Sequence, residues 1–310
     1  MLGAPWIGQH DRVTFTQRPP FDSLPAEVRT ALADELGAAV TSSTDCVGGM
    51  SPAAAAVLRL SDGRQVFAKV ISAEVSQSST MLYDRELGVL PLLGDHVPHA
   101  RFLGELRLGP WRGVITEALP GGPPGPPWTA ESVDATLAAL DAFGTAPAGL
   151  PEPLDHSPHW KGWRELVTRD RTTLDPWERD RVEVLAALET DWEVWTKGDA
   201  LVHQDVRGDN AVAGPDGVRL VDWAFGTSGA VWMNRAELAV DVMAAGSLEL
   251  ALRCVDGCPP EAGRLAVVLA GMWRRNSERP PHPGMPTHRA WQRRRADSLR
   301  PLLDVVLAKL

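Results

Sequence analysis

Residues 201–223 constrain this chain most, because they set polar side chains inside two hydrophobic runs. His203, Asp205 and Asn210 follow the first run, and Asp222 lies at the end of the second. An Asp-Gly pair between the runs predicts a tight turn that brings Asp222 back, antiparallel, towards Asn210. A carboxylate, an amide and a second carboxylate in such a segment can orient a hydroxyl and hold a divalent ion beside a polyphosphate. A surface hairpin is the simpler alternative, but the flanking apolar runs argue against it.

Length and composition predict a globular chain with two unequal lobes. Of the 310 residues, 44% are hydrophobic and 23% are charged, which is enough to form a sizeable core. The sequence has no apolar run of about 18 residues, and residues 1–12 lack a basic segment followed by an apolar one. We therefore expect no membrane span, no secretion and a cytoplasmic location.

The three cysteines, Cys46, Cys254 and Cys258, do not predict a disulfide framework, because their number is odd and the chain is large. The close pair Cys254 and Cys258 resembles half of a metal site. However, no second Cys or His pair stands at a matching spacing. Free thiols near a helix start are the simpler interpretation.

Charge is unevenly distributed along the chain, whose net charge is −9. Residues 122–270 carry 24 acidic and 12 basic residues, whereas residues 271–310 carry 9 basic and 3 acidic ones. An acidic body disfavours nucleic acid as a partner and would attract a small cationic molecule. Solubility alone is the alternative explanation.

The first 119 residues predict an antiparallel sheet with one main helix inserted. Ser23 as a cap, a proline in the first turn and a closing Gly37 predict a short helix over residues 24–37. Strands are expected at residues 39–46, 53–60, 65–72, 101–106 and 111–117, and a further helix at residues 79–93. A run rich in Pro and Gly over residues 120–128 predicts a hinge between the lobes.

The remaining residues, 129–310, predict a larger and mostly helical lobe. Helices are expected at residues 129–143, 160–171, 177–196, 234–247, 259–277 and 287–309. Tryptophans recur there, mostly at helical positions: Trp160, Trp163, Trp177, Trp192, Trp195, Trp273 and Trp291. Packing in or near the core is the expected role of each, with substrate stacking as the alternative.

Two charged residues of the first lobe are predicted to form an ion pair. Strand alternation places Lys69 on an apolar face with Phe67, where a buried ammonium needs an anion. Glu86 stands four residues from a leucine on either side, so it falls on the inward stripe of its helix. A lysine that reaches solvent from an edge strand is the alternative.

A glycine pair precedes the second predicted strand. Gly48 and Gly49, followed by Ser51, would let backbone amides approach a phosphate. An ordinary turn is the alternative.

Taken in order, these features resemble the aminoglycoside phosphotransferase and choline kinase-like branch of the protein-kinase-like superfamily. The order is a glycine turn, a strand lysine, a helix glutamate, an H-x-D-x-x-x-x-N motif and an Asp-Trp pair. The resemblance covers roughly residues 40–245, and residues 203–223 are its most specific part. It implies an α+β, two-lobed protein-kinase-like fold with a nucleotide-binding lobe at residues 1–119 and a catalytic, acceptor-binding lobe at residues 129–310.

The resemblance also implies roles for individual residues. Asp205 would be the catalytic base, and Asn210 and Asp222 would bind Mg²⁺. The nucleotide would be bound by Gly48, Gly49, Ser51, Lys69 with its partner Glu86, and two hinge residues at the purine edge, Glu117 and Leu119.

The sequence departs from the family pattern at Gln204, where the family usually has Gly between the His and the Asp. A side chain there would either narrow the acceptor site or point into the core. Residues 280–286 and the basic segment after them have no clear counterpart in the antibiotic-resistance members.

The chemistry predicted from these residues is transfer of the γ-phosphate of ATP or GTP, with Mg²⁺, to a hydroxyl. The acceptor would be small and cationic, such as an aminoglycoside or amino sugar. A catalytically silent nucleotide-binding pseudokinase with a regulatory or binding role is one alternative. A metal hydrolase that uses His203, Asp205, Asp209 and Asp222 is another, but it leaves Lys69 unexplained. The oligomeric state is left open.

Overall fold

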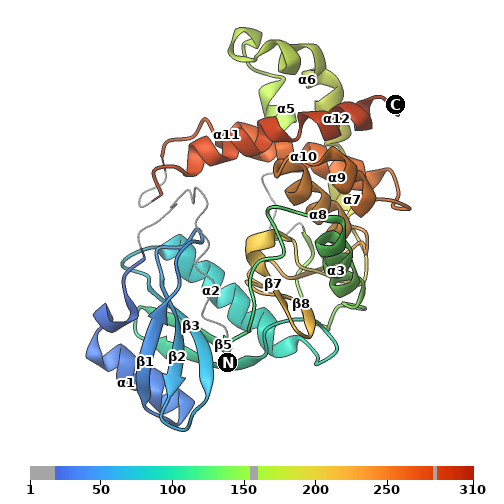
Figure 1. Cartoon of the computed structure of the whole chain (residues 1–310). Coiled ribbons are helices and arrows are strands. Elements are labelled where there is room, and N and C mark those ends of the chain that lie inside the picture. Colours follow the sequence, from blue (N-terminus) through green and yellow to red (C-terminus); the bar gives the residue numbers. More distant parts are fainter. Residues whose placement is uncertain (1–17, 154–159, 282–284) are drawn as a thin grey trace. The chain divides into compact units, whose positions relative to one another are not determined.

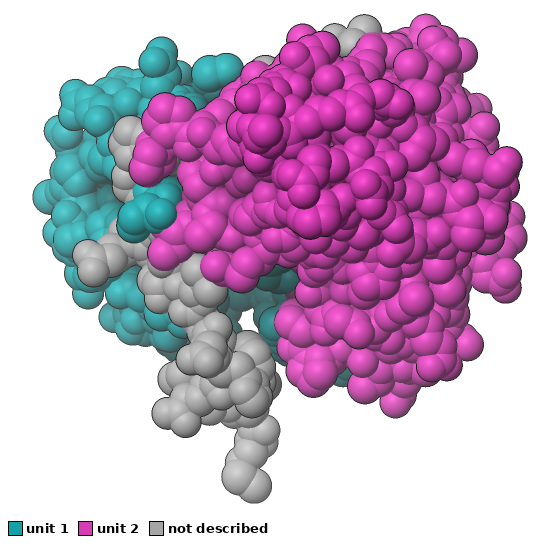
Figure 2. Space-filling view, turned by 90° about the horizontal axis from the view of Figure 1, so that it is seen from above, with its two compact units in different colours: residues 1–123, 209–225, 283–286 teal, residues 124–208, 226–282, 287–310 magenta. Residues whose placement is uncertain are grey.

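The computed structural model describes residues 18–153, 160–281 and 285–310. The expectation about residues 1–12 lies outside this part of the chain, and so do residues 282–284 of the proline-rich stretch. The described residues divide into two compact units, which have separate colours in Figure 2. Unit 1 comprises residues 18–123, 209–225 and 285–286, and unit 2 comprises residues 124–153, 160–208, 226–281 and 287–310. The lobe limits expected at residues 1–119, 120–128 and 129–310 stay predictions.

Unit 1 contains a five-stranded antiparallel sheet with the strand order β1-β2-β3-β5-β4 (Figure 1). The strands are β1 (Val40–Asp45), β2 (Ala54–Leu60), β3 (Gln65–Ser72), β4 (Phe102–Leu108) and β5 (Trp111–Glu117). All five strands were expected, within two residues at each end. Alternation and turn signals were sufficient here because each strand has one face in the core.

Helix α1 (Ala26–Leu36) packs on the sheet face that carries the main core of unit 1. Val28 and Leu32 of this helix cluster with Ala68 and Val70 of β3. Ser23 was wrongly expected to be the cap, because it ends a 3₁₀ turn, η1 (Phe21–Ser23). The helix begins after Pro25 without a side-chain cap, and Gly37 ends it with φ 65°, as expected.

Helix α2 (Gln77–Val89) begins two residues earlier than predicted, because the Ser76 hydroxyl accepts a hydrogen bond from the Ser79 N–H. It ends before Pro91, where the chain tightens into a 3₁₀ turn, η2 (Leu90–Leu92). Its inward residues include Tyr83, Glu86 and Leu87.

A second hairpin belongs to unit 1 although it comes late in the sequence. Strands β7 (Ala211–Gly214) and β8 (Gly217–Leu220) pair antiparallel across the predicted turn. The Leu220 N–H donates to the Pro98 carbonyl (2.8 Å), and the Ala213 N–H donates to the Gly122 carbonyl (2.7 Å). These bonds fix the hairpin to segments just before and after the β4–β5 pair.

Unit 2 is mostly helical (Figure 1). Its α-helices are α3 (Ala130–Asp141), α5 (Gly162–Leu166), α6 (Pro176–Leu188), α7 (Trp192–Trp195), α8 (Met233–Ala244), α9 (Leu248–Cys254), α10 (Glu261–Asn276), α11 (His288–Ser298) and α12 (Arg300–Leu307), and a 3₁₀ turn is η3 (Arg171–Thr173). Two short strands, β6 (Ala200–Val202) and β9 (Thr227–Gly229), pair antiparallel. Among the described residues, no helix is long and apolar enough to cross a bilayer.

Several helix predictions in unit 2 were too long. The helix expected at residues 177–196 breaks where Asp191 takes a left-handed backbone (φ 57°). The one expected at residues 287–309 breaks at Leu299, just before Pro301, which cannot continue a helix interior. Helix α5 ends at Leu166 rather than residue 171, and α9 and β9 were not predicted.

The tryptophans of unit 2 mostly pack as expected. Trp160, Trp163 and Trp192 are buried, and the rings of Trp160 and Trp192 meet edge to face at 5.0 Å. The others are half-buried and hold arginines over their faces, including Arg264 over Trp195 at 5.1 Å. The cysteines are free.

Glu189 caps the start of α5 from the end of α6. Its buried carboxylate accepts hydrogen bonds from the backbone N–H groups of Trp163 (3.0 Å) and Arg164 (2.9 Å). Burial raises the pKa of Glu189 to about 7, and these two bonds oppose the rise. A carboxyl that is more basic folded than unfolded stabilises the fold most when it is protonated, so its contribution falls as the pH rises from about 4.5 to 7.

We therefore expect Glu189→Gln to gain stability relative to the wild type as the pH rises. The relative free energy of unfolding should shift by up to about 3 kcal/mol between pH 5 and pH 8. Urea unfolding of both proteins at the two pH values measures this shift. Glu131→Gln, at an exposed glutamate of α3, is the matched control. A difference between wild type and Glu189→Gln that does not change with pH would contradict the assignment.

Candidate active site

Lys69 is at the centre of the candidate site in unit 1. Its Nζ lies 2.6 Å from an oxygen of Glu86 and 2.9 Å from an oxygen of Asp222. The predicted Lys69–Glu86 ion pair is therefore confirmed, and the structure adds Asp222 to it. Strand β3 supplies the lysine, α2 the glutamate and the segment after β8 the aspartate. Three segments that are far apart in the sequence thus meet at one ammonium group.

The charges of this group stabilise one another. Burial alone would lower the pKa of Lys69, but the Asp222 and Glu86 carboxylates raise it above its usual value. Burial raises the pKa of Glu86, and the Lys69 charge opposes this rise. The side chains of Lys69 and Glu86 are 12% and 3% exposed, whereas Asp222 is 46% exposed. Asp222 is thus the member of the group that a ligand from solvent can reach.

The β7–β8 hairpin brings Asn210 and Asp222 together, as the sequence predicted. Next to the paired ends of its strands, the Val221 N–H donates to the Asn210 carbonyl at 2.9 Å. Asp222 then takes a left-handed backbone conformation (φ 65°), which is uncommon outside Gly and is often found at functional sites. Amide and carboxylate oxygens are hard donors that suit Mg²⁺, so the residues present fit that ion.

The predicted phosphate loop connects β1 and β2. Gly48 and Gly49 have φ values of 94° and 80°, which glycine adopts without strain. The sequence did not predict that Arg18 lies against this loop. Its Nε donates to the Gly48 carbonyl (2.5 Å), and its Nη1 donates to the Ala53 carbonyl (3.3 Å).

Tyr83 lies beside Lys69, on the inward side of α2. The Lys69 Nζ lies 5.0 Å from the centroid of the Tyr83 ring. Tyr83 was also not predicted, although a signal existed. It is the only tyrosine in the chain, and it precedes Glu86 by three residues on the same helix face.

The two hinge residues differ in their surroundings. Glu117 ends β5, and its carboxylate accepts the Arg101 N–H (2.9 Å) and pairs with Arg219 (3.0 Å). The Glu117 N–H donates to the Arg101 carbonyl at 2.9 Å. Leu119 is half-buried, and its backbone N–H makes no hydrogen bond within the described residues.

Asp205 lies in unit 2, in the loop after β6. Its carboxylate is 28% exposed and lies 3.5 Å from the guanidinium of Arg207. Gln204 before it has φ 61°, again in the left-handed region. A residue with a side chain adopts this conformation at a cost of about 1–2 kcal/mol, which Gly, the usual residue of the resembled family here, would not pay.

One face of α8 holds the loop that carries Asp205. The Asn234 side chain accepts the His203 N–H and donates to the Leu201 carbonyl, both at 2.9 Å. One and two turns further on, Glu237 accepts the Val206 N–H (3.3 Å), and Asp241 accepts the Gly208 N–H (3.0 Å). The sequence carries this signal as polar residues at helical spacing inside an apolar helix, but it was not recognised.

Two of these α8 residues are buried acids with different partners. Burial raises the pKa of Glu237 well above its usual value, and the Asp205 charge raises it further. Asp241 instead pairs with Arg295 (2.5 Å) and accepts a hydrogen bond from Trp128 Nε1 (3.2 Å). Arg295 also lies over the ring of Trp273, with its central carbon 5.2 Å from the ring centroid. Helix α11 therefore contributes to holding the Asp205 loop.

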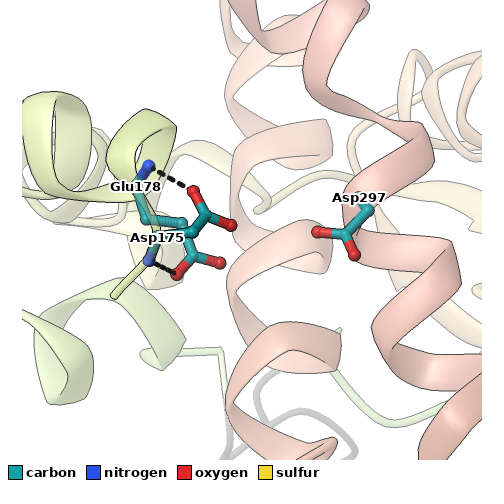
Figure 3. A group of neighbouring side chains, drawn as sticks. All are labelled: Asp175, Glu178 and Asp297. Carbon is teal, nitrogen blue, oxygen red and sulfur yellow. Dashed lines mark hydrogen bonds between the residues drawn. The ribbon is translucent and has the colours of Figure 1, made fainter. Parts of the chain in front are cut away.

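A separate group of acidic residues in unit 2 has the spacing of a metal site, but neighbouring arginines already balance its negative charge. Asp175, Glu178 and Asp297 are the one group of three or more potential ligands among the described residues (Figure 3). Asp175 and Glu178 form the capping box of α6, in which the backbone N–H of each donates to the carboxylate of the other. Their carboxylates lie close to three guanidinium groups, those of Arg274, Arg293 and Arg300. With that many cations, the group is a salt-bridge network around the buried Glu178 and does not need a metal ion.

Comparisons with protein-family models and with curated protein sequences find no match. Solved structures do match over most of the chain. A choline kinase from Streptococcus pneumoniae has a TM-score of 0.58 at 13% identity, over 89% of this chain and 98% of the other. The APH(2″)-IIia complex with GDP and kanamycin has a TM-score of 0.60 at 14% identity, over 90% of this chain and 98% of the other. A choline/ethanolamine kinase family protein from Mesorhizobium loti has a TM-score of 0.58 at 16% identity, over 91% of this chain and 97% of the other.

These identities are low, so the likeness establishes the fold alone. The chain has the fold of the aminoglycoside phosphotransferase and choline kinase-like proteins. This confirms the predicted α+β, protein-kinase-like architecture and the resemblance on which it rested.

Proposed function

We propose that this chain is a small-molecule kinase that transfers the γ-phosphate of ATP or GTP to a hydroxyl group. The observation that carries the proposal is Lys69, held by Glu86 and by the more exposed Asp222 in one group. A lysine fixed in this way can neutralise a nucleotide phosphate without losing its position. The metal-hydrolase alternative gives this lysine no role.

The proposed roles follow from the residues. Asp205 accepts the proton of the acceptor hydroxyl. Asn210 and Asp222 are the ligands for Mg²⁺, which would neutralise phosphate charge when bound.

At the purine edge, the Leu119 N–H and the Glu117 carbonyl are the proposed hydrogen-bonding groups. The Leu119 N–H has no other partner among the described residues, which supports this role. Gly48, Gly49 and Ser51 are the proposed contacts of the phosphate chain.

For the acceptor we propose a small cation with a free hydroxyl, of the aminoglycoside or amino-sugar class. The acidic excess of residues 122–270 supports it. So do the matched structures, one of which is a choline kinase and another a complex with kanamycin.

A panel of hydroxylated acceptors, cationic and neutral, tests both the proposed phosphotransferase activity and the proposed cationic acceptor. We expect ADP or GDP release, measured with coupling enzymes, to depend on an acceptor and on Mg²⁺. Cationic acceptors should turn over faster than neutral ones of the same size. Equal turnover of the two sets would contradict the cationic acceptor. Nucleotide binding without transfer to any acceptor would favour the pseudokinase.

A further inference from the structure

Arg18 places a fixed guanidinium inside the glycine loop of unit 1. Besides its two bonds to the Gly48 and Ala53 carbonyls, its Nη2 lies so close to Gly49 that an added Cβ there would be 2.2 Å away. A side chain at position 49 would displace the Arg18 guanidinium, and the φ of 80° favours glycine at this position in any case.

Arg18 has unused hydrogen-bonding capacity. A guanidinium has five N–H donors in a rigid fork, and two of the Arg18 nitrogens donate to loop carbonyls. No carboxylate of the described residues lies within ion-pair distance of it. A half-buried guanidinium with donors remaining suits a phosphate group, which it can bind in a bidentate manner.

The charges around Lys69 show why a second cation is needed. Lys69 already pairs with Glu86 and Asp222, so its single charge does not offset the several negative charges of a triphosphate. The Arg18 charge reaches the same region: burial raises the pKa of Tyr83, and the charges of Lys69 and Arg18 both oppose this rise. Tyr83 itself lies against Lys69, whose Nζ is 5.0 Å from the centroid of the ring. Arg18 is thus the cation of this region that has no described acidic partner.

We propose that Arg18 binds the phosphate chain of the nucleotide, as a second protein cation beside Lys69, held in place by the glycine loop. This inference rests on the proposed function, because it takes the ligand to be a nucleoside triphosphate. On this inference, Arg18 increases the affinity of the site for a nucleoside triphosphate relative to the nucleoside. A residue with a purely structural role would not change this preference.

The test compares triphosphates with nucleosides. Calorimetric titration of the full chain with Mg·ATP, Mg·GTP, adenosine and guanosine gives each affinity. We expect Arg18→Gln to weaken binding of the preferred triphosphate by about 10- to 100-fold, the usual range for a lost hydrogen bond to a charged group. Its nucleoside should bind as in the wild type. Arg18→Lys, which keeps the charge but not the fork, should lie between Arg18→Gln and the wild type.

Arg59→Gln is the matched control, because it removes the same charge from an exposed position on β2. Triphosphate affinity of Arg18→Gln within about twofold of the wild type would overturn the inference alone. Equal weakening of triphosphate and nucleoside would also overturn it, because that result marks a structural role. A wild type that binds no nucleotide would overturn the proposed function, and this inference with it.

Discussion

Asp205→Asn is expected to lower kcat by about 10²- to 10⁴-fold, the usual contribution of a general base, while nucleotide affinity stays within about twofold. Asparagine keeps the size and most hydrogen bonds of the side chain but cannot accept the hydroxyl proton. The backbone on both sides of Asp205 is fixed by Asn234 and Glu237, so the substitution should not displace the loop. Asp205→Ala should have at least as large an effect.

The measurement needs both kcat with the best acceptor and the affinity for Mg·nucleotide by titration. Asp180→Asn is the matched control, because this aspartate is exposed on α6 in the same unit. Near wild-type turnover of this variant would show that Asp205 is not the general base. A variant that lost nucleotide binding as well would show that Asp205 acts through the nucleotide site.

Arg274→Met is expected to cost about 3–5 kcal/mol of the free energy of unfolding, because it leaves a buried acid without its main partner. Arg274 and Glu178 are 4% and 1% exposed, and the arginine Nε lies 2.5 Å from the glutamate. Arg293 Nη2 lies 3.2 Å from the same glutamate, which favours the lower end of this range. Urea unfolding measures the change.

Two further variants test whether the loss of stability arises because the Arg274–Glu178 ion pair is buried. Arg171→Met breaks an exposed pair with Glu183, and we expect it to cost less than about 1 kcal/mol. The double variant Arg274→Met and Glu178→Gln should recover part of the loss, because it removes the unpaired charge as well. If Arg274→Met were as mild as Arg171→Met, the buried Arg274–Glu178 pair would not contribute to stability as described.

The parts of the site that sequence reasoning found are those governed by local periodicity. Lys69 alternates with the core residues of β3, and Glu86 falls on the inward stripe of α2, so each could be placed from its neighbours. Asp222 was expected near Asn210 because an Asp-Gly turn fixes the return of the hairpin. Its ion pair with Lys69, 153 residues away, has no local signal.

Tyr83 and the polar face of α8 were missed although the sequence carries a signal for each, whereas other missed parts depend on tertiary structure. Arg18 is 30 residues from Gly48, and nothing in its neighbourhood marks it. Gln204 and Asp222 adopt left-handed backbones that their residue types do not predict. The helix break at Asp191 was missed for a similar reason: the pattern of apolar residues continues across it although the backbone does not. The break at Leu299 did have a local signal, Pro301, which the prediction did not use.

The most direct test of the proposed phosphotransferase is a phosphorus NMR spectrum of the wild type with Mg²⁺, ATP or GTP and the pooled acceptor panel. The proposal predicts a new phosphomonoester signal that grows with the nucleoside diphosphate signals, and that does not appear with Asp205→Asn. Nucleotide signals that stay unperturbed by the protein, with no phosphoester from any acceptor, would contradict it.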